Sequence, residues 1–186
     1  ILIVAAVLLV ALGSVQAGNE NRNGTAGATE LLIPVGARGS AMAGSVVANS
    51  FGVDALYWNP AGLASAAKRE VTVSHAELAV DTRHDFLAYA HPAARGTFAV
   101  GGTYLSHEDL DGRDSLGRPT GAFGASDAAV SFGYGFKGAL TDLGVAVKYV
   151  RSHIGSAEAQ TAAVDAGLQK AFGAVTLGAV LRNAGP

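Results

Sequence analysis

The sequence predicts an all-β fold, a transmembrane antiparallel β-barrel that begins with a plug inside its lumen. Three observations support this prediction. Seven segments of about ten residues alternate apolar with small or polar residues. The connections between them are short at one end of the expected sheet and longer at the other. A compact, turn-broken segment, Gly36 to Leu63, precedes them.

Composition excludes several classes of protein. The chain has 186 residues and a formal net charge of -2, so its charge does not favour nucleic-acid binding. Charged residues make up 15%, against roughly 25% in ordinary soluble domains. The chain has no Cys, which excludes a disulfide framework and thiolate metal sites. We expect no cofactor.

The first residues predict a secretory signal peptide, residues 1–17. Ile1 to Gly13 is almost wholly apolar, and Val15-Gln16-Ala17 places small residues at a cleavage site after Ala17. A membrane-spanning helix is the alternative, but it needs about 20 apolar residues. Since the chain starts at Ile1 without a basic region, we expect its natural start to be missing.

Residues 18–66 are predicted to form the plug. The small and apolar residues of Gly36 to Asn49 permit a short helix. Asn59-Pro60 forces a turn, because the residue before Pro is disfavoured in the right-handed helical region. The alternative is an ordinary helix that caps a soluble β-domain. Small residues favour the plug, since a plug must pack closely against inward-facing side chains.

Residues 67–186 are predicted to form the first part of the barrel. Each strand has one apolar face and one small or polar face, because successive side chains point to opposite sides of a strand. The alternation covers residues 71–76, 86–91, 97–104, 129–136, 144–149, 164–169 and 176–182.

Strand length and connections favour a membrane barrel over a soluble sandwich. Strands that cross a bilayer need about 9 to 11 residues, whereas soluble strands have about 5 to 6. Short turns are predicted at 92–95, 137–142 and 171–173, and long polar loops at Ser106 to Gly121 and Arg151 to Ala159. Outer-membrane barrels show this asymmetry, and their strand number is even. The segment is therefore expected to be about half of a barrel.

Two runs in the expected plug are the most specific motifs. They are Gly36-Ala37-Arg38-Gly39-Ser40-Ala41-Met42-Ala43-Gly44 and, after Ala48, Asp54-Ala55 with Tyr57-Trp58-Asn59-Pro60-Ala61-Gly62-Leu63. With His75-Ala76-Glu77, Asp85 to Ala90, Val164 to Leu168 and Leu181 to Pro186, they resemble the PorV/PorQ family of the FadL-like outer-membrane barrels. The chain departs from that family at Ala184, where Leu is more usual.

The resemblance implies a barrel of about 14 strands in the bacterial outer membrane, with the N-terminal segment in its lumen. It further implies a role in type IX protein secretion, through contacts with secretion-system components and exported cargo proteins. FadL-like transport of hydrophobic small molecules across the outer membrane is the alternative. A soluble extracellular β-protein, such as an adhesin, is a third hypothesis.

The candidate site residues are interpreted as structural. Inside a lumen Arg38 needs a partner, and Asp54 is a candidate. Asn59 is expected to cap the turn that Pro60 presets, and Trp58 to pack on the barrel wall. The plug-motif residues are Gly36, Arg38, Gly39, Met42, Gly44, Asp54, Tyr57, Trp58, Asn59, Pro60 and Gly62. The lumen-facing candidates are Lys148, Asp165 and Arg182.

We predict no enzymatic activity, because no catalytic motif is present. The His residues are scattered, and His84 and Asp85 are strand neighbours that point to opposite faces. Asp109, Asp111 and Asp114 lack the spacing of a calcium loop and are interpreted as a solvated loop.

Overall fold

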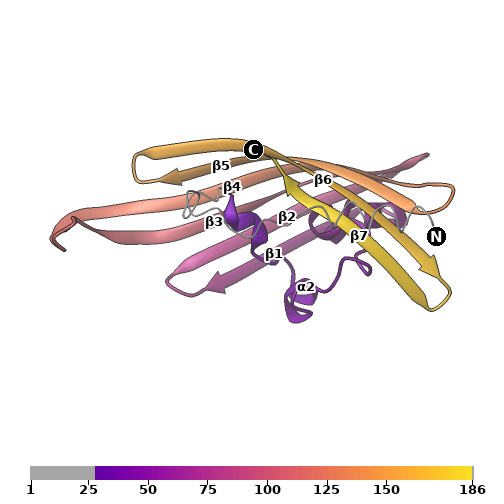
Figure 1. Cartoon of the computed structure of the whole chain (residues 1–186), viewed down its shortest axis with the longest axis horizontal. Coiled ribbons are helices and arrows are strands. Elements are labelled where there is room, and N and C mark those ends of the chain that lie inside the picture. The colour runs from indigo at the N-terminus through magenta and orange to yellow at the C-terminus, as the bar shows by residue number, and fades with distance from the viewer. Residues whose placement is uncertain (1–27, 186) are drawn as a thin grey trace, which may run out of the picture.

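The computed structural model of the chain describes residues 28–185. The predicted signal peptide and the first part of the predicted plug lie outside these residues. The described part begins with short helices and continues into strands (Figure 1).

The strands form a single antiparallel sheet in sequence order, as the alternation predicts. Its strands are β1 (Glu70–Leu78), β2 (Thr82–Ala93), β3 (Gly96–Arg113), β4 (Pro119–Lys137), β5 (Asp142–Ile154), β6 (Ala157–Phe172) and β7 (Val175–Ala184). Within the described residues β1 and β7 are the two edges, and the sheet curls from one edge to the other (Figure 1). The prediction of an all-β fold with an antiparallel sheet is therefore confirmed.

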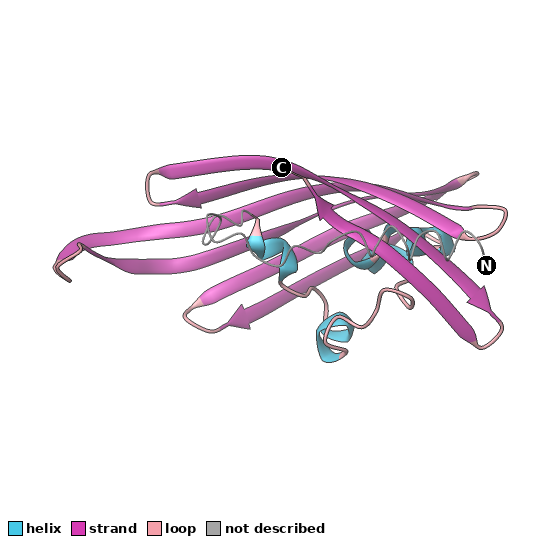
Figure 2. Cartoon of the chain, in the orientation of Figure 1, coloured by secondary structure: helices cyan, strands magenta, loops and turns pink. Residues whose placement is uncertain are grey.

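Short helices occupy the N-terminal segment, which we define as residues 28–66. They are η2 (Thr29–Leu32), α2 (Ala37–Ala41), η3 (Gly52–Asp54), α3 (Ala55–Trp58) and η4 (Pro60–Ser65). They lie on the side toward which the sheet curls (Figure 2). None of the helices in the described range is long and apolar enough to cross a membrane.

The two predicted long loops are wrong, because both segments continue as strands. β3 runs to Arg113, and Leu110 pairs with Phe123 of β4 beyond a register shift. β5 and β6 are joined by a turn at Gly155, which has a φ of 60°. Antiparallel pairing satisfies backbone N–H and C=O groups whatever the side chains, so polar residues continue these hairpins.

Register partners on the uncovered face form apolar rows that cross the sheet. One row consists of Val71, Tyr89, Val100, Phe132, Val147 and Val164. The next consists of Val73, Leu87, Gly102, Val130, Tyr149 and Ala162. Large side chains in these rows are open to the surroundings: Val73 is 74% exposed and Phe132 is 52% exposed.

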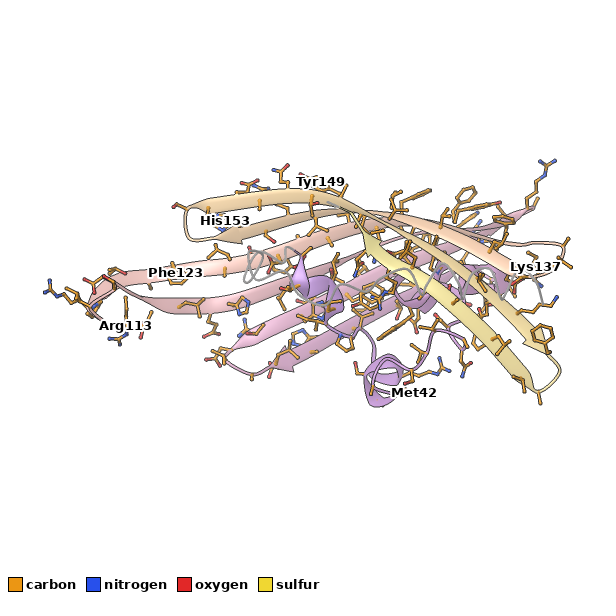
Figure 3. All side chains as sticks on the ribbon, viewed as in Figure 1. Met42, Arg113, Phe123, Lys137, Tyr149 and His153 are labelled. Carbon is orange, nitrogen blue, oxygen red and sulfur yellow. The ribbon has the colours of Figure 1, made fainter. Side chains whose placement is uncertain are left out.

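Two rows that are mostly polar follow the apolar rows on the side of the long β3–β4 hairpin. The nearer row consists of His75, Asp85, Tyr104, Ala128, Arg151 and Gln160. The farther row consists of Glu77, Arg83, Ser106, Ser126, His153 and Glu158. Figure 3 shows Arg113 at the tip of that hairpin and Lys137 toward the opposite end of the sheet. The uncovered face is therefore apolar in the middle and polar toward the hairpin end.

The opposite face of the sheet carries small residues under the N-terminal segment. One row consists of Ala90, Ala99, Gly133, Ala146 and Asp165. The main buried cluster joins this face to residues of the N-terminal segment, including Leu56, Tyr57, Trp58 and Leu63. The protein core therefore lies between the segment and the sheet.

Candidate functional site

The Asn59-Pro60 turn is seated on a row of glycines. Asn59 is extended at φ -160°, and its Oδ1 accepts a hydrogen bond from the Ala61 amide at 3.1 Å. The predicted cap is thereby confirmed. The Asn59 amide donates to the carbonyls of Val47 at 2.8 Å and Leu168 at 3.2 Å. One side chain thus links two parts of the N-terminal segment to β6.

The glycine row makes this close approach possible. Gly135, Gly144 and Gly167 are register partners on three adjacent strands. A Cβ at Gly144 or Gly135 would overlap the Pro60 backbone, and one at Gly167 would overlap the Asn59 side chain. Only glycine provides the flat surface on which this turn lies.

Replacing Gly144 by Ala is expected to lower the free energy of unfolding by about 1–3 kcal/mol, since the added methyl group forces backbone apart. The matched control is Gly124→Ala on β4, where a Cβ would meet no atom within 4 Å. Urea unfolding measures both changes. Equal stability of Gly144→Ala and the unsubstituted protein would contradict this role of the glycine row.

A buried charge cluster lies on β5 and β6, two of the strands that carry the glycine row. The Lys148 ammonium is 2.7 Å from Asp165 Oδ2, and the two side chains are 2% and 0% exposed. The Lys148 ammonium also donates to Asn183 Oδ1 at 2.7 Å. The second Asp165 oxygen accepts from the Asn183 amide at 2.7 Å. A buried ion pair needs such additional hydrogen bonds to offset its desolvation.

A β-bulge brings Arg182 and Asn183 to the same side of β7. The register shifts between Val164 and Ala166, so the two β7 residues lie opposite Asp165 alone. Asn183 has a φ of 54°, a conformation that Asn tolerates better than most residues. The bulge therefore places both side chains near the N-terminal segment.

Arg182 contacts the aromatic residues of the motif. Its guanidinium carbon lies 4.6 Å from the centre of the Tyr57 ring and 5.5 Å from that of Trp58. Its Nη2 donates to the Leu31 carbonyl at 3.4 Å. Burial raises the pKa of the Tyr57 hydroxyl, and the nearby positive charge of Arg182 opposes that rise. The Tyr57 hydroxyl donates to the Ile33 carbonyl at 2.5 Å.

The glycine-rich motif packs on Trp58. A Cβ at Gly39 would overlap the indole ring, and one at Gly44 would lie 3.5 Å from it. Gly44 also has a φ of 78°, where a side chain would be strained. Both glycines thus set the distance between this motif and the tryptophan.

The predicted pairing of Arg38 with Asp54 is wrong. Arg38 Nη1 donates to the Asn49 carbonyl at 2.7 Å, and no carboxylate of the described chain lies within 4.0 Å of the guanidinium. Both side chains are exposed in the part of the chain that the structure describes. They line the same groove, together with Gly36 and Gly39.

Three further predicted residues have separate surroundings. Met42 is 40% exposed and lies in the part of the N-terminal segment that is farthest from the strands in Figure 3. A Cβ at Gly62 would overlap the Ser50 carbonyl. The Gly36 amide donates to the Ser74 hydroxyl at 3.3 Å, which ties the motif to β1.

Sequence reasoning missed the glycine row and Asn183. The small residues of each strand were visible, but their alignment into one row depends on register. The bulge that turns Asn183 toward Lys148 has no local signal beyond the Asn itself. Among the described residues no group of three or more His, Asp or Glu is placed to hold a metal ion.

No protein-family model matches the chain, and no curated protein matches it either.

Proposed function

We propose that the chain forms part of the wall of an outer-membrane β-barrel of the PorV/PorQ type, with the N-terminal segment as its lumen plug. One observation carries the proposal: the open face of the sheet is apolar, while the covered face is small and polar. A soluble protein has the reverse arrangement, because large exposed apolar patches are unfavourable in water. Transmembrane barrels face lipid with their apolar side.

The apolar rows cover part of the height of a bilayer. On the open face of β4, the apolar and aromatic run from Val130 to Phe136 spans about 20 Å along the strand at about 3.4 Å per residue, and Ala128 before it pairs with Arg151. With a strand tilt of about 40°, the height of this run is about 16 Å, against the roughly 25 Å band of outer-membrane barrels. The polar row that contains Ser126 then lies at the membrane surface.

Heat-modifiable migration on a gel tests the barrel itself. The protein is expected to fractionate with outer membranes, and to migrate differently before and after boiling. A soluble protein whose migration does not change with boiling would contradict the proposal.

We further propose a role in type IX secretion through protein contacts. Two features support this role. The plug motifs resemble those of the PorV/PorQ family, and the β3–β4 hairpin extends well beyond the polar row that contains Ser126 (Figure 3). Its turn is ordered, since Asp114 Oδ1 accepts from the amides of Leu116 at 2.9 Å and Arg118 at 2.8 Å. Leu116 is 72% exposed there and available to a partner protein.

Shortening this hairpin tests the role. His107 and Ala125 are register partners, so an Asn-Gly turn can join them in place of residues 108–124. The shortened protein is expected to keep its heat-modifiable migration and to lose secretion of cargo proteins, as deletion of the whole gene should. Intact secretion in both strains, with loss of growth on fatty acids in the deletion strain, would instead favour FadL-like transport.

A further inference from the structure

A groove of about 340 Å³ lies between the N-terminal segment and β1. Residues of the glycine-rich motif, of η3 and of α3 line it, and Thr72 and Ser74 contribute from β1. This volume is at the lower end of the range of about 300–1,000 Å³ that small-molecule sites occupy. The groove therefore suits a ligand of amino-acid or dipeptide size.

Two opposite charges face the groove without neutralising each other. Arg38 uses one nitrogen for the Asn49 carbonyl, which leaves its other donors open. The Asp54 carboxylate has no hydrogen bond or ion pair to another residue of the described chain. His75 also lines the groove, but its Nδ1 lies 2.7 Å from Asp85. Among the described residues that line the groove, the charges without an ionic partner are thus one cation and one anion.

A buried hydroxyl also faces the groove. Ser50 is 2% exposed, and its Oγ has no hydrogen-bond partner among the described residues. Leaving a buried polar group unpaired is unfavourable, because the group has lost its hydrogen bonds to water. A polar group of a bound molecule would satisfy this hydroxyl.

The remaining lining is apolar. Val35, Val46 and Trp58 are 3%, 2% and 6% exposed, and all three border the groove. Trp58 packs directly against α2 there, because Gly39 has no side chain and a Cβ at that position would overlap the indole. An aliphatic group in the groove would therefore lie against valine and tryptophan.

We propose that this groove binds a zwitterionic amino acid or dipeptide with an apolar side chain. Arg38 receives the carboxylate, Asp54 receives the ammonium, and the apolar side chain lies beside Val35, Val46 and Trp58. Arginine suits this role because its guanidinium can bind a carboxylate through two parallel hydrogen bonds. The groove is too small for a long-chain lipid.

The single Trp of the chain provides a direct measurement. Titration of the detergent-solubilised protein with leucine and with leucyl-leucine is expected to shift Trp58 emission saturably. Isoamylamine lacks the carboxylate of leucine, and 4-methylpentanoate lacks its ammonium, so each should bind at least about tenfold more weakly. Absence of a saturable shift, or equal binding of a singly charged analogue, overturns the proposal.

Substitutions assign the two charges. Arg38→Gln and Asp54→Asn are each expected to weaken binding by about tenfold or more, because each removes a charge-assisted contact. Arg95→Gln is the matched control, since Arg95 is exposed in the β2–β3 turn and does not line the groove. Unchanged affinity in Arg38→Gln or Asp54→Asn contradicts the assignment. The analogue series on the unsubstituted protein decides the matter if a variant fails to fold.

Discussion

Replacing Asp165 by Ala is expected to lower the free energy of unfolding by about 3–5 kcal/mol. The substitution leaves the Lys148 ammonium buried with no carboxylate, although it lies only 2.7 Å from one in the native structure. It also removes the acceptor of the Asn183 amide, which holds the bulge on β7. Urea unfolding of the protein in detergent micelles or lipid vesicles measures the change.

Two controls separate the charge imbalance from a general loss of packing. The double variant Lys148→Met with Asp165→Leu removes both charges and should recover much of the stability, because apolar replacements of buried pairs are often tolerated. Glu158→Ala breaks an ion pair with Arg151 that is exposed on the uncovered face, and should have no measurable effect. A double variant as unstable as Asp165→Ala would show that the charge balance is not the cause.

Replacing Phe132 by Arg is expected to destabilise the folded protein in lipid vesicles by about 2–4 kcal/mol, the cost of a charged side chain near the middle of a bilayer. Phe132 lies in the central apolar row and is 52% exposed. In water the same substitution would remove an exposed apolar group and be tolerated. The sign and size of the change in folding free energy therefore indicate whether lipid or water surrounds this face.

The matched control is Ser126→Arg, on the same strand and the same face. Ser126 belongs to the polar row between Ser106 and His153. At the membrane surface an added Arg costs about 0–1 kcal/mol. Equal effects at Phe132 and Ser126 would contradict the proposed position of the bilayer.

Much of the sheet could be predicted from the sequence, because alternation is a local property. In β5 the apolar Val145 and Val147 alternate with Gly144 and Ala146, and the structure places the two sets on opposite faces. The tight turn at Gly155 did not stand out, because the strand ends on both sides of it contain polar residues such as His153 and Glu158. Backbone pairing does not require apolar side chains, so polarity alone misplaced the ends of these strands.

The candidate site was only partly predictable. The capping of the turn by Asn59 follows from the Asn-Pro pair itself, and the structure confirms it. The partner of Arg38 could not be predicted, since it is the backbone carbonyl of Asn49, and a carbonyl has no signature in the sequence.

Local sequence accounts for the period of two, the apolar and small faces of each strand, and the turn at Asn59-Pro60. The register and the bulges depend on contacts between distant segments. Contacts such as Gln169 Nε2 to the Ala48 carbonyl, at 2.6 Å, join residues 121 positions apart. The glycine row, the Lys148–Asp165 pair and the groove all depend on such contacts, because each is assembled from segments that meet only when the sheet curls around the N-terminal segment.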